Sequence, residues 1–525
     1  MEMAENYLLG MDCGTTNIKA IILGDDGKKV AEASSPSTFI TPGPNMQEQD
    51  ANDWWRQTKE IFQKLSNQAG QDVVKKIKGI CISSHTVSML PVDENGVPLR
   101  NAMTYQDSRS AEELEEIVAK VGFEKFVNTV GGQPAVAFLP CKILWFIKNE
   151  PELFQRTACF LQASSFINFK LTGNMTTDID QATRTQCLDM HTMEWSKDIG
   201  DAIGIDLNKY LPAPQLVDEI IGFVKEDAAK ETGLVPGIPV MAGCSDAMAS
   251  MYATGLSRLG EAGESSGTTS LVFIGSEKKS ALDIPVVTRP CAIDGMPWIF
   301  DAPIQTSGAA LKWFIEGFAG EERAYCEEHG LNIYSYLNEL ALETDPGSNG
   351  LYFFPYLLGE RAPLWNDHAR GMFIGLDMGM SRADLIRSVF EGTAFALRHV
   401  VETVKESGGK CNALRICGGG AKSRTWSMIK ASMLHCPVYL LDESSGDVPV
   451  GDALIAGHKV GIFPNLTKAV ESVVKVNEII QPNPQWEKVY DQMYPYYVEM
   501  YKDLDETLKH LRVDIKDIQK SLSRA

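Results

Sequence analysis

The stretch Met11–Leu23 reads MDCGTTNIKAIIL, and the stretch Gly263–Gly275 reads GESSGTTSLVFIG, so one Gly-Thr-Thr turn occurs twice in the chain. Each copy separates two short β-prone runs, which predicts an antiparallel hairpin with the turn at its tip. Glycine permits backbone conformations in which neighbouring amides face one point, and the threonine hydroxyls add donors. The repeat therefore predicts two anion-binding hairpins, one at the head of each half. Two plain hairpins are the alternative.

The composition is that of a globular protein with more than one core. The 525 residues are 44% hydrophobic and 22% charged, so we expect two domains. The chain has 49 basic and 69 acidic residues, a net charge of −20. This charge argues against nucleic acid and anionic membranes as partners, because both bind through basic patches. It does not exclude a phosphorylated small molecule.

The cysteines and the first residues predict a cytoplasmic location. The 11 cysteines are scattered, without the paired spacing of a zinc site, so reduced thiols are expected. The N-terminal stretch MEMAENYLLG lacks the pattern of a signal peptide. No apolar run approaches the ~20 residues that span a bilayer.

Strand and helix patterns alternate along the chain, which predicts an α/β fold. Buried strands are expected at 77–83 and 413–417, and helices at 50–68, 111–120, 384–406 and 425–435. The stretch ICGGGAKSRTWSMIKASML at 416–434 predicts a strand, a glycine turn and a helix capped by Ser423. It matches neither the Walker nor the Rossmann nucleotide motif, and a plain strand-to-helix turn is the alternative to a ligand loop.

Ten short motifs occur in an order that is specific to one family. They are MDCGTTNIKA, QEQDANDWW, KILWFIKNEPELF, FKLTG, TTDIDQATRT, PVMAGCSDAMASMYATG, GESSGTTS, FFPYLLGERAPLW, EGTAFALR and CGGGAKSRTW. Through them the chain, over roughly residues 6–480, resembles the FGGY carbohydrate kinases, which include xylulokinases, gluconokinases and glycerol kinases. The resemblance implies two ribonuclease-H-like domains of the actin and hexokinase type that close on ATP. Closure with the sugar implies low ATPase activity without it.

The resemblance also implies a division of the chain. Residues 1–255 are expected to form the N-terminal kinase domain, with sugar and phosphate sites, and residues 256–480 the C-terminal, nucleotide-binding domain. Residues 481–525 are expected to form a helical tail whose tyrosines pack against the protein, with a dimer contact as the alternative. A homodimer is a possible partner state in this family.

Two acids carry the chemistry that the resemblance implies. Asp246, in GCSDAMA, matches the catalytic base that accepts the proton of the attacking sugar hydroxyl. On sequence alone, Asp246 also fits a helix N-cap. Asp12 matches the acid that holds Mg²⁺, and Asp246 belongs to the same metal set.

The implied nucleotide contacts come from both halves. They are Asp12, Gly14, Thr15, Thr16, Lys19, Gly267, Thr268, Thr269, Ser307, Gly308, Gly419, Gly420 and Ala421. Lys19 is expected either to reach the phosphates or to be a solvated strand residue. Trp313 is expected in the core, and Arg361 is expected to pair with Glu360 in a structural role.

The sugar segment differs from the best-known family members. Glycerol kinases carry Gln-Arg-Glu and xylulokinases Gln-Met-His-Gly, where this chain reads SSHTVSML, with His85 and Thr86 in the first two positions. His85 is expected to donate to a sugar hydroxyl or to be structural. The family element Trp-x-Asp-x-Arg reads YQDSR, so Asp107 and Arg109 are expected at the substrate. The first expected substrate is D-xylulose. Gluconate, ribulose, L-xylulose and erythritol are the alternatives.

Two other classes of protein share this fold. A non-catalytic ATP-binding protein of the actin type predicts loss of Asp246, which is present. A sugar-responsive regulator predicts a basic DNA-binding extension before residue 6, which the sequence lacks.

Overall fold

The computed structural model describes residues 4–282, 285–442 and 446–522, and its contacts divide the chain into two units. Unit 1 consists of Met1–Ser257, Glu277–Ile299 and Ser444–Lys475, and unit 2 of Arg258–Ser276, Phe300–Glu443 and Val476–Ala525. Each unit therefore combines segments that are distant in sequence. The consecutive boundaries at 255 and 480 concern functional domains and stay a prediction.

Unit 1 is built on a mixed sheet in which the first hairpin lies beside a parallel strand. The strand order is β13-β14-β5-β1-β2-β3, and β15 also pairs with β5. β1 runs antiparallel to β2 and parallel to β5. The strands are β1 (Tyr7–Cys13), β2 (Asn17–Gly24), β3 (Lys29–Pro36), β5 (Ile77–Ser84), β13 (Ile220–Phe223), β14 (Pro239–Met241) and β15 (Cys244–Ser245).

Helices cover this sheet because the apolar side chains on one face of each helix pack against the buried side chains of the strands. Those packed on it are α1 (Ala51–Ala69), α7 (Ala163–Thr172), α12 (Asp246–Ala253) and α18 (Val448–Lys459), while α3 (Ala111–Val121) and α5 (Leu139–Asn149) pack in a second core of unit 1. Trp54 and Phe62 of α1 pack in the same core as Leu9 of β1 and Ile80 of β5. The Asp50 side chain caps α1 by accepting from the amide of Asn52.

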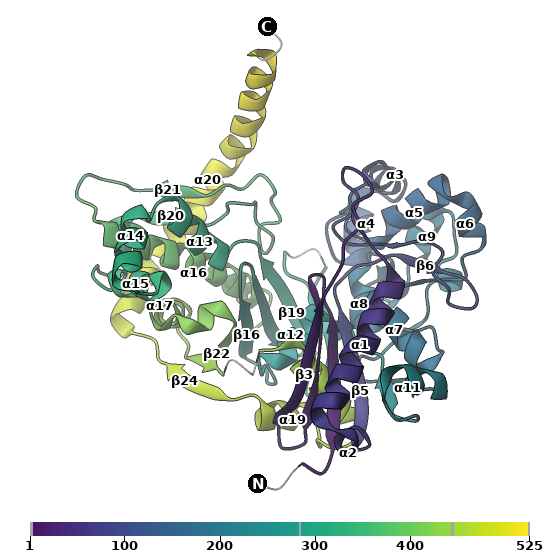
Figure 1. Cartoon of the computed structure of the whole chain (residues 1–525). Coiled ribbons are helices and arrows are strands. Elements are labelled where there is room, and N and C mark those ends of the chain that lie inside the picture. The colour runs from purple at the N-terminus through teal and green to yellow at the C-terminus, as the bar shows by residue number, and fades with distance from the viewer. Residues whose placement is uncertain (1–3, 283–284, 443–445, 523–525) are drawn as a thin grey trace. The chain divides into compact units, whose positions relative to one another are not determined.

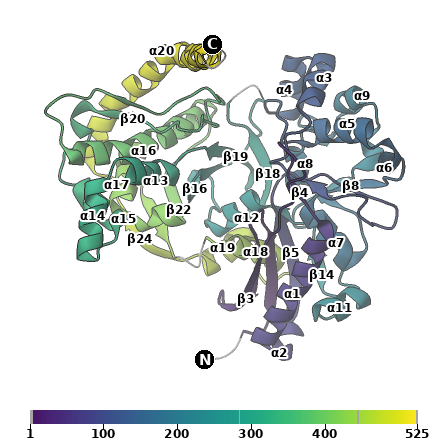
Figure 2. The same cartoon turned by 45° about the horizontal axis from the view of Figure 1, so that its top comes forward.

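Helix α18 returns from the C-terminal part of the chain to pack on β1 and β5 (Figure 2). A Cβ added at Gly10 would lie 1.9 Å from the carbonyl oxygen of Pro449, so the helix approaches β1 at a distance that only glycine permits. This packing brings Asp452, in the middle of α18, against the buried strands.

Unit 2 repeats the topology of unit 1. β16 runs antiparallel to β17 and parallel to β22, as β1 does with β2 and β5, and the neighbouring strands follow the order β19-β17-β16-β22-β23-β24. The strands are β16 (Glu261–Ser266), β17 (Ser270–Ser276), β19 (Met296–Ile304), β22 (Ala413–Cys417), β23 (Val438–Leu441) and β24 (Val476–Ile480). The predicted α/β fold and both Gly-Thr-Thr hairpins are confirmed.

The helices of unit 2 (Figure 1) share a large core that is rich in aromatic side chains. They include α13 (Gly308–Gly317), α16 (Arg382–Glu406), α17 (Arg424–Leu434) and α20 (Pro484–Leu522). Tyr490, Tyr497 and Tyr501 of α20 are buried, and the hydroxyls of Tyr497 and Tyr356 lie 2.8 Å apart. The prediction that the tyrosines of the tail pack against the protein is confirmed for these three, whereas Tyr496 is 61% exposed.

The remaining expectations about local structure also hold. The helices at 384–406 and 425–435 and the strand at 413–417 occur within two residues of their expected bounds, and Ser423 caps α17. All 11 cysteines are free thiols. Among the described residues, no helix combines the length and apolarity that crossing a membrane requires.

Candidate active site

The carbonyl groups of the first Gly-Thr-Thr turn accept hydrogen bonds from neighbouring residues of unit 1. Ser37 Oγ donates to the carbonyl of Gly14 over 3.1 Å, the Ser37 amide donates to that of Thr16, and Gln49 Nε2 to that of Thr15. The amides of Thr15 and Thr16 donate to no partner in the part of the chain that the structure describes. The turn therefore offers N–H groups, as an anion cradle does.

The second turn is held in the same way by other residues. The amides of Ser307 and Ala309 donate to the carbonyl of Thr268, and the Gly308 amide donates to that of Gly267 over 2.9 Å. Within residues 4–282, 285–442 and 446–522, the amides of Thr268 and Thr269 likewise have no hydrogen-bond acceptor. This pair of cradles is the shared geometry behind the sequence repeat.

Asp246 is the first residue of α12, and it does not cap the helix. The N-cap is Ser245, whose Oγ accepts from the amide of Met248, while Asp246 Oδ1 accepts from the amide of Ala247. The N-cap interpretation of Asp246 is therefore wrong. Ser245 is fixed in turn by Asp180, which accepts from its amide and its hydroxyl.

Asp12 lies at the end of β1, close enough to Asp246 for the two carboxylates to repel. Burial, and then the charge of Asp246, raise the pKa of Asp12 well above its usual range. Two facing carboxylates are oxygen donors that suit Mg²⁺, which commonly binds through one or two carboxylates and substrate phosphates. Among the described residues, no group of three or more His, Cys, Asp or Glu side chains is arranged to hold a metal ion.

Asp452 was missed by the sequence analysis although it belongs to this acid cluster. Its side chain is fully buried, and Oδ2 accepts from Ser83 Oγ over 2.8 Å, while Ser83 Oγ lies 3.4 Å from Asp12 Oδ1. Burial, and then the charge of Asp12, raise the pKa of Asp452. A lone acid inside the apolar run VGDALIAG was a usable signal. The sequence around Asp452 does not indicate that this helix packs in unit 1.

The expected adenosine loop is a short 3-10 turn between β22 and α17. Gly418 has a φ of 84°, and a Cβ at Gly420 would lie 2.1 Å from Ser266 Oγ, so the loop is pressed against the end of β16. The amide of Ala421 donates to the carbonyl of Gly418, and Gly419 is exposed. Within unit 2 the structure therefore gathers this loop, the second turn and Ser307–Gly308.

His85 is buried, and its bonding differs from the expected donor role. Nδ1 lies 3.0 Å from the carbonyl of Cys13, which only accepts, so Nδ1 carries the proton. Burial lowers the pKa of His85 to about 4, so the ring is neutral and Nε2 is an acceptor. In the described part of the chain Nε2 has no partner. Thr86 Oγ1 donates to Gln181 Oε1 over 3.1 Å.

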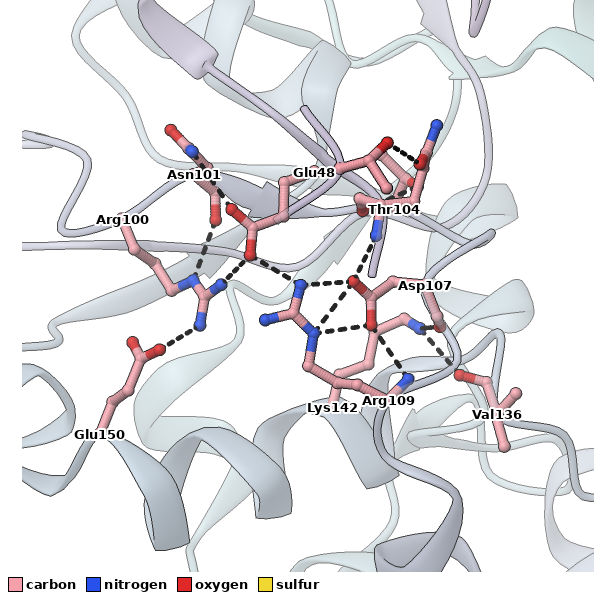
Figure 3. A network of polar contacts seen from close by, with 11 residues as sticks. Glu48, Arg100, Asn101, Thr104, Asp107, Arg109, Val136, Lys142 and Glu150 are labelled. Atoms are coloured by element: carbon pink, nitrogen blue, oxygen red, sulfur yellow. Dashed lines mark hydrogen bonds and ion pairs between the residues drawn. The ribbon is translucent and has the colours of Figure 1, made fainter. Parts of the chain in front are cut away.

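Asp107 and Arg109 lie in a polar network rather than at an open site (Figure 3). Asp107 is fully buried, and its two oxygens accept from the Gln47 amide and from the Arg109 amide, Nε and Nη2. Both oxygens are therefore engaged inside the network, and the expected contact of Asp107 and Arg109 with the substrate stays a prediction. Arg109 Nη2 also donates to Glu48 over 2.7 Å.

Further members make this network rigid. Arg100 pairs with Glu48 and, over 2.6 Å, with Glu150, and the guanidinium groups of Arg100 and Arg109 lie 5.5 and 5.0 Å from the centre of the Trp145 ring. Lys142 Nζ donates to the carbonyl of Asp107 over 2.6 Å and to that of Val136 (Figure 3). Burial lowers the pKa of Lys142 to about 8. The network fixes the backbone that connects β7 (Ala102–Met103) to α3.

The remaining expected residues have partners within their own unit. Lys19 Nζ pairs with Glu32 at 2.7 Å and Asp447 at 2.8 Å, so it is neither free nor simply solvated. Trp313 is half-buried and stacks on Phe353. Glu360 Oε1 accepts from the amides of Arg361 and Gln305, which ties the GERAP segment to the end of β19.

Glu360 leads to a testable pH dependence. Burial raises its pKa from 4.5 to about 7, so the folded protein holds this proton more tightly than the unfolded chain does. The contribution of Glu360 to stability is therefore present at low pH and is lost as the pH rises towards 7. The free energy of unfolding of Glu360→Gln, relative to that of the parent, should rise by about 2 kcal/mol from about pH 5.5 to about pH 8. Urea unfolding of both proteins at the two pH values measures this difference, and an equal difference at both would contradict it.

Comparisons with known proteins place the chain in a family context. The model of the FGGY family of carbohydrate kinases matches with its N-terminal domain at residues 7–253 and with its C-terminal domain at residues 264–460. A xylulose kinase of Staphylococcus epidermidis is 28% identical over 98% of this chain and 100% of its own. A gluconokinase of Bacillus subtilis is 26% identical over 98% of this chain and 99% of its own.

A solved structure supports the same assignment. The crystal structure of xylulose kinase from Rhodospirillum rubrum is similar to this chain with a TM-score of 0.86 and 28% identity, over 96% of this chain and 100% of that one.

Proposed function

The chain belongs to the FGGY family of carbohydrate kinases, and we propose that it transfers the γ-phosphoryl group of ATP to a ketopentose, with D-xylulose as the first candidate. The observation that carries the proposal is the pair of Gly-Thr-Thr turns whose carbonyls accept hydrogen bonds and whose threonine amides have no acceptor among the described residues. Such turns suit the oxygens of a phosphate chain, and the full-length likeness to xylulose kinases suits the sugar.

Unit 1 supplies the base in this proposal. Asp246 accepts the proton of the sugar hydroxyl as that oxygen attacks the γ-phosphorus and the bond to the β-phosphate oxygen breaks. Asp246 suits this role because it begins α12 without being used as its cap. Asp12, with Asp246 nearby, would hold Mg²⁺, and that ion would neutralise phosphate charge.

The nucleotide residues of the proposal are those expected from the sequence. Thr15 and Thr16 offer amides in unit 1, and Thr268 and Thr269 do so in unit 2, with Gly267, Ser307, Gly308 and the Gly419–Ala421 loop beside them. The Asp107–Arg109 network acts by holding the backbone between β7 and α3 in place. In this proposal, His85 Nε2 accepts a hydrogen bond from a hydroxyl group of the sugar. We also propose that the protein acts in the cytoplasm, which suits its free thiols. A homodimer is the proposed alternative to a monomer.

A coupled ADP-release assay with a panel of acceptors tests the proposal. The panel consists of D-xylulose, L-xylulose, D-ribulose, gluconate, erythritol and glycerol. We expect D-xylulose to give a kcat/KM at least about 10²-fold above that of glycerol, because a site that hydrogen-bonds several hydroxyls leaves them unpaired with a shorter acceptor. ATP hydrolysis without acceptor should be slow.

The other outcomes of this assay are informative. Faster turnover of another polyhydroxylated acceptor would keep the kinase and replace the substrate. ATP hydrolysis at full rate without any acceptor, or ATP binding with no turnover of the whole panel, would contradict the proposed kinase reaction.

A further inference from the structure

A buried ion pair lies behind the second Gly-Thr-Thr turn. Lys430 Nζ on α17 is 2.7 Å from Oε1 and 2.8 Å from Oε2 of Glu264 on β16, and the two side chains are 2% and 1% exposed. Lys430 also lies 4.3 Å from the centre of the Trp426 ring. No role in the proposed reaction has been given to this pair.

Two serines extend the contacts of this pair. A carboxylate only accepts, so Ser270 Oγ donates to Glu264 Oε1 over 2.7 Å. Ser270 Oγ also lies 2.9 Å from Ser307 Oγ. The chain of polar contacts therefore runs from Ser307 through Ser270 to Glu264, which Lys430 holds from the other side.

This chain joins the three nucleotide elements of unit 2. Glu264 and Ser270 lie on the two strands that flank the Gly267–Thr269 turn, and Ser307 precedes α13. Lys430 lies on α17, the helix that begins directly after the Gly418–Lys422 turn.

A buried ion pair by itself is weak evidence for stability, because the cost of taking two charges out of water offsets their attraction. We propose that Lys430 and Glu264 are positioning residues for the nucleotide, which act through Ser270 to fix the Gly267–Thr269 turn, Ser307 and the Gly418–Lys422 turn relative to one another. The inference rests on the proposed function, since it assumes that these elements bind ATP.

The same unit contains a matched control. Arg387 and Glu391, both on α16, form a pair with an Nε–Oε1 distance of 2.6 Å and exposures of 1% and 2%. Glu391 accepts from the amide of Gly347 and from the hydroxyls of Ser348 and Tyr490. This pair is as buried as the first, and its bonds lead to α20 and to the segment before β20 (Tyr352–Phe354).

The test compares Ser270→Ala, Glu264→Gln and Glu391→Gln in the full chain. Calorimetry measures the ADP dissociation constant, kinetics measure KM for ATP and for the sugar, and thermal unfolding measures stability. Ser270→Ala and Glu264→Gln should weaken ADP binding at least about 10-fold, or about 1.4 kcal/mol, with the sugar KM unchanged. Glu391→Gln should lower the unfolding temperature and leave ADP affinity unchanged.

Each outcome decides the inference. Parent-like ADP affinity in both Ser270→Ala and Glu264→Gln would overturn it, and so would an equal loss in Glu391→Gln, which would indicate a general loss of stability. If Glu264→Gln does not fold, Ser270→Ala decides, because it leaves the ion pair in place. If the parent protein itself does not bind ADP, the proposed function fails instead.

Discussion

Asp246→Asn is expected to lower the turnover of the preferred sugar by about 10²–10⁴-fold, the usual contribution of a positioned general base. The amide keeps the size of the side chain and the oxygen that accepts from the Ala247 amide. It cannot take the proton of a sugar hydroxyl. ADP affinity should stay within about threefold, or about 0.7 kcal/mol, of the parent value. The coupled assay and calorimetry measure the two quantities.

Stability separates this loss of activity from a loss of structure. Ser245 caps α12, and Asp246 repels Asp12, so Asp246→Asn should change the unfolding midpoint little. Asp206→Asn is the matched control, because Asp206 is also an acid at a helix start and only caps α10 (Leu207–Tyr210). The control should keep full turnover. An Asp246→Asn protein with more than about a tenth of the parent rate would contradict the role of a base.

Features set by short stretches of sequence could be predicted well. Both hairpins, the Ser423 cap and the buried tyrosines of the tail depend on residues close to one another or on a helical period. These signals are local, because a turn needs its glycine and a helix needs its cap at fixed spacing.

Features that depend on distant segments could not be predicted. Asp452 meets Ser83 only because α18 returns to β1 over Gly10, about 440 residues away in the chain. The bonds of the Asp107 carboxylate to the Gln47 amide and to Arg109, which also bonds to Glu48, could not be read from the motif. Motif matching gives the type of residue at a position, whereas the direction and partners of its side chain depend on packing.

Gly308→Ala is expected to reduce kcat/KM for ATP by about 10²-fold, since misplacing a site by about 1 Å has effects of this size. The added Cβ would lie 2.5 Å from the carbonyl oxygen of Gly267, whereas an ordinary contact is 3.4–4 Å. The turn or the start of α13 must therefore move. The three hydrogen bonds that the amides of residues 307–309 donate to the carbonyls of the turn must change with it. The stability of α13 itself should not fall, because alanine has a higher helix propensity than glycine.

Gly317→Ala provides the matched control for this prediction, at the other end of α13. Its added Cβ would meet no atom within 4 Å among the described residues, and Gly317 does not have a positive φ. We expect a change of less than about threefold in kcat/KM for ATP and in ADP affinity. Equal effects of the two substitutions would show that the close approach of Gly308 to Gly267 does not set the turn. A large effect of Gly308→Ala alone means that backbone contact between the two segments shapes the nucleotide site.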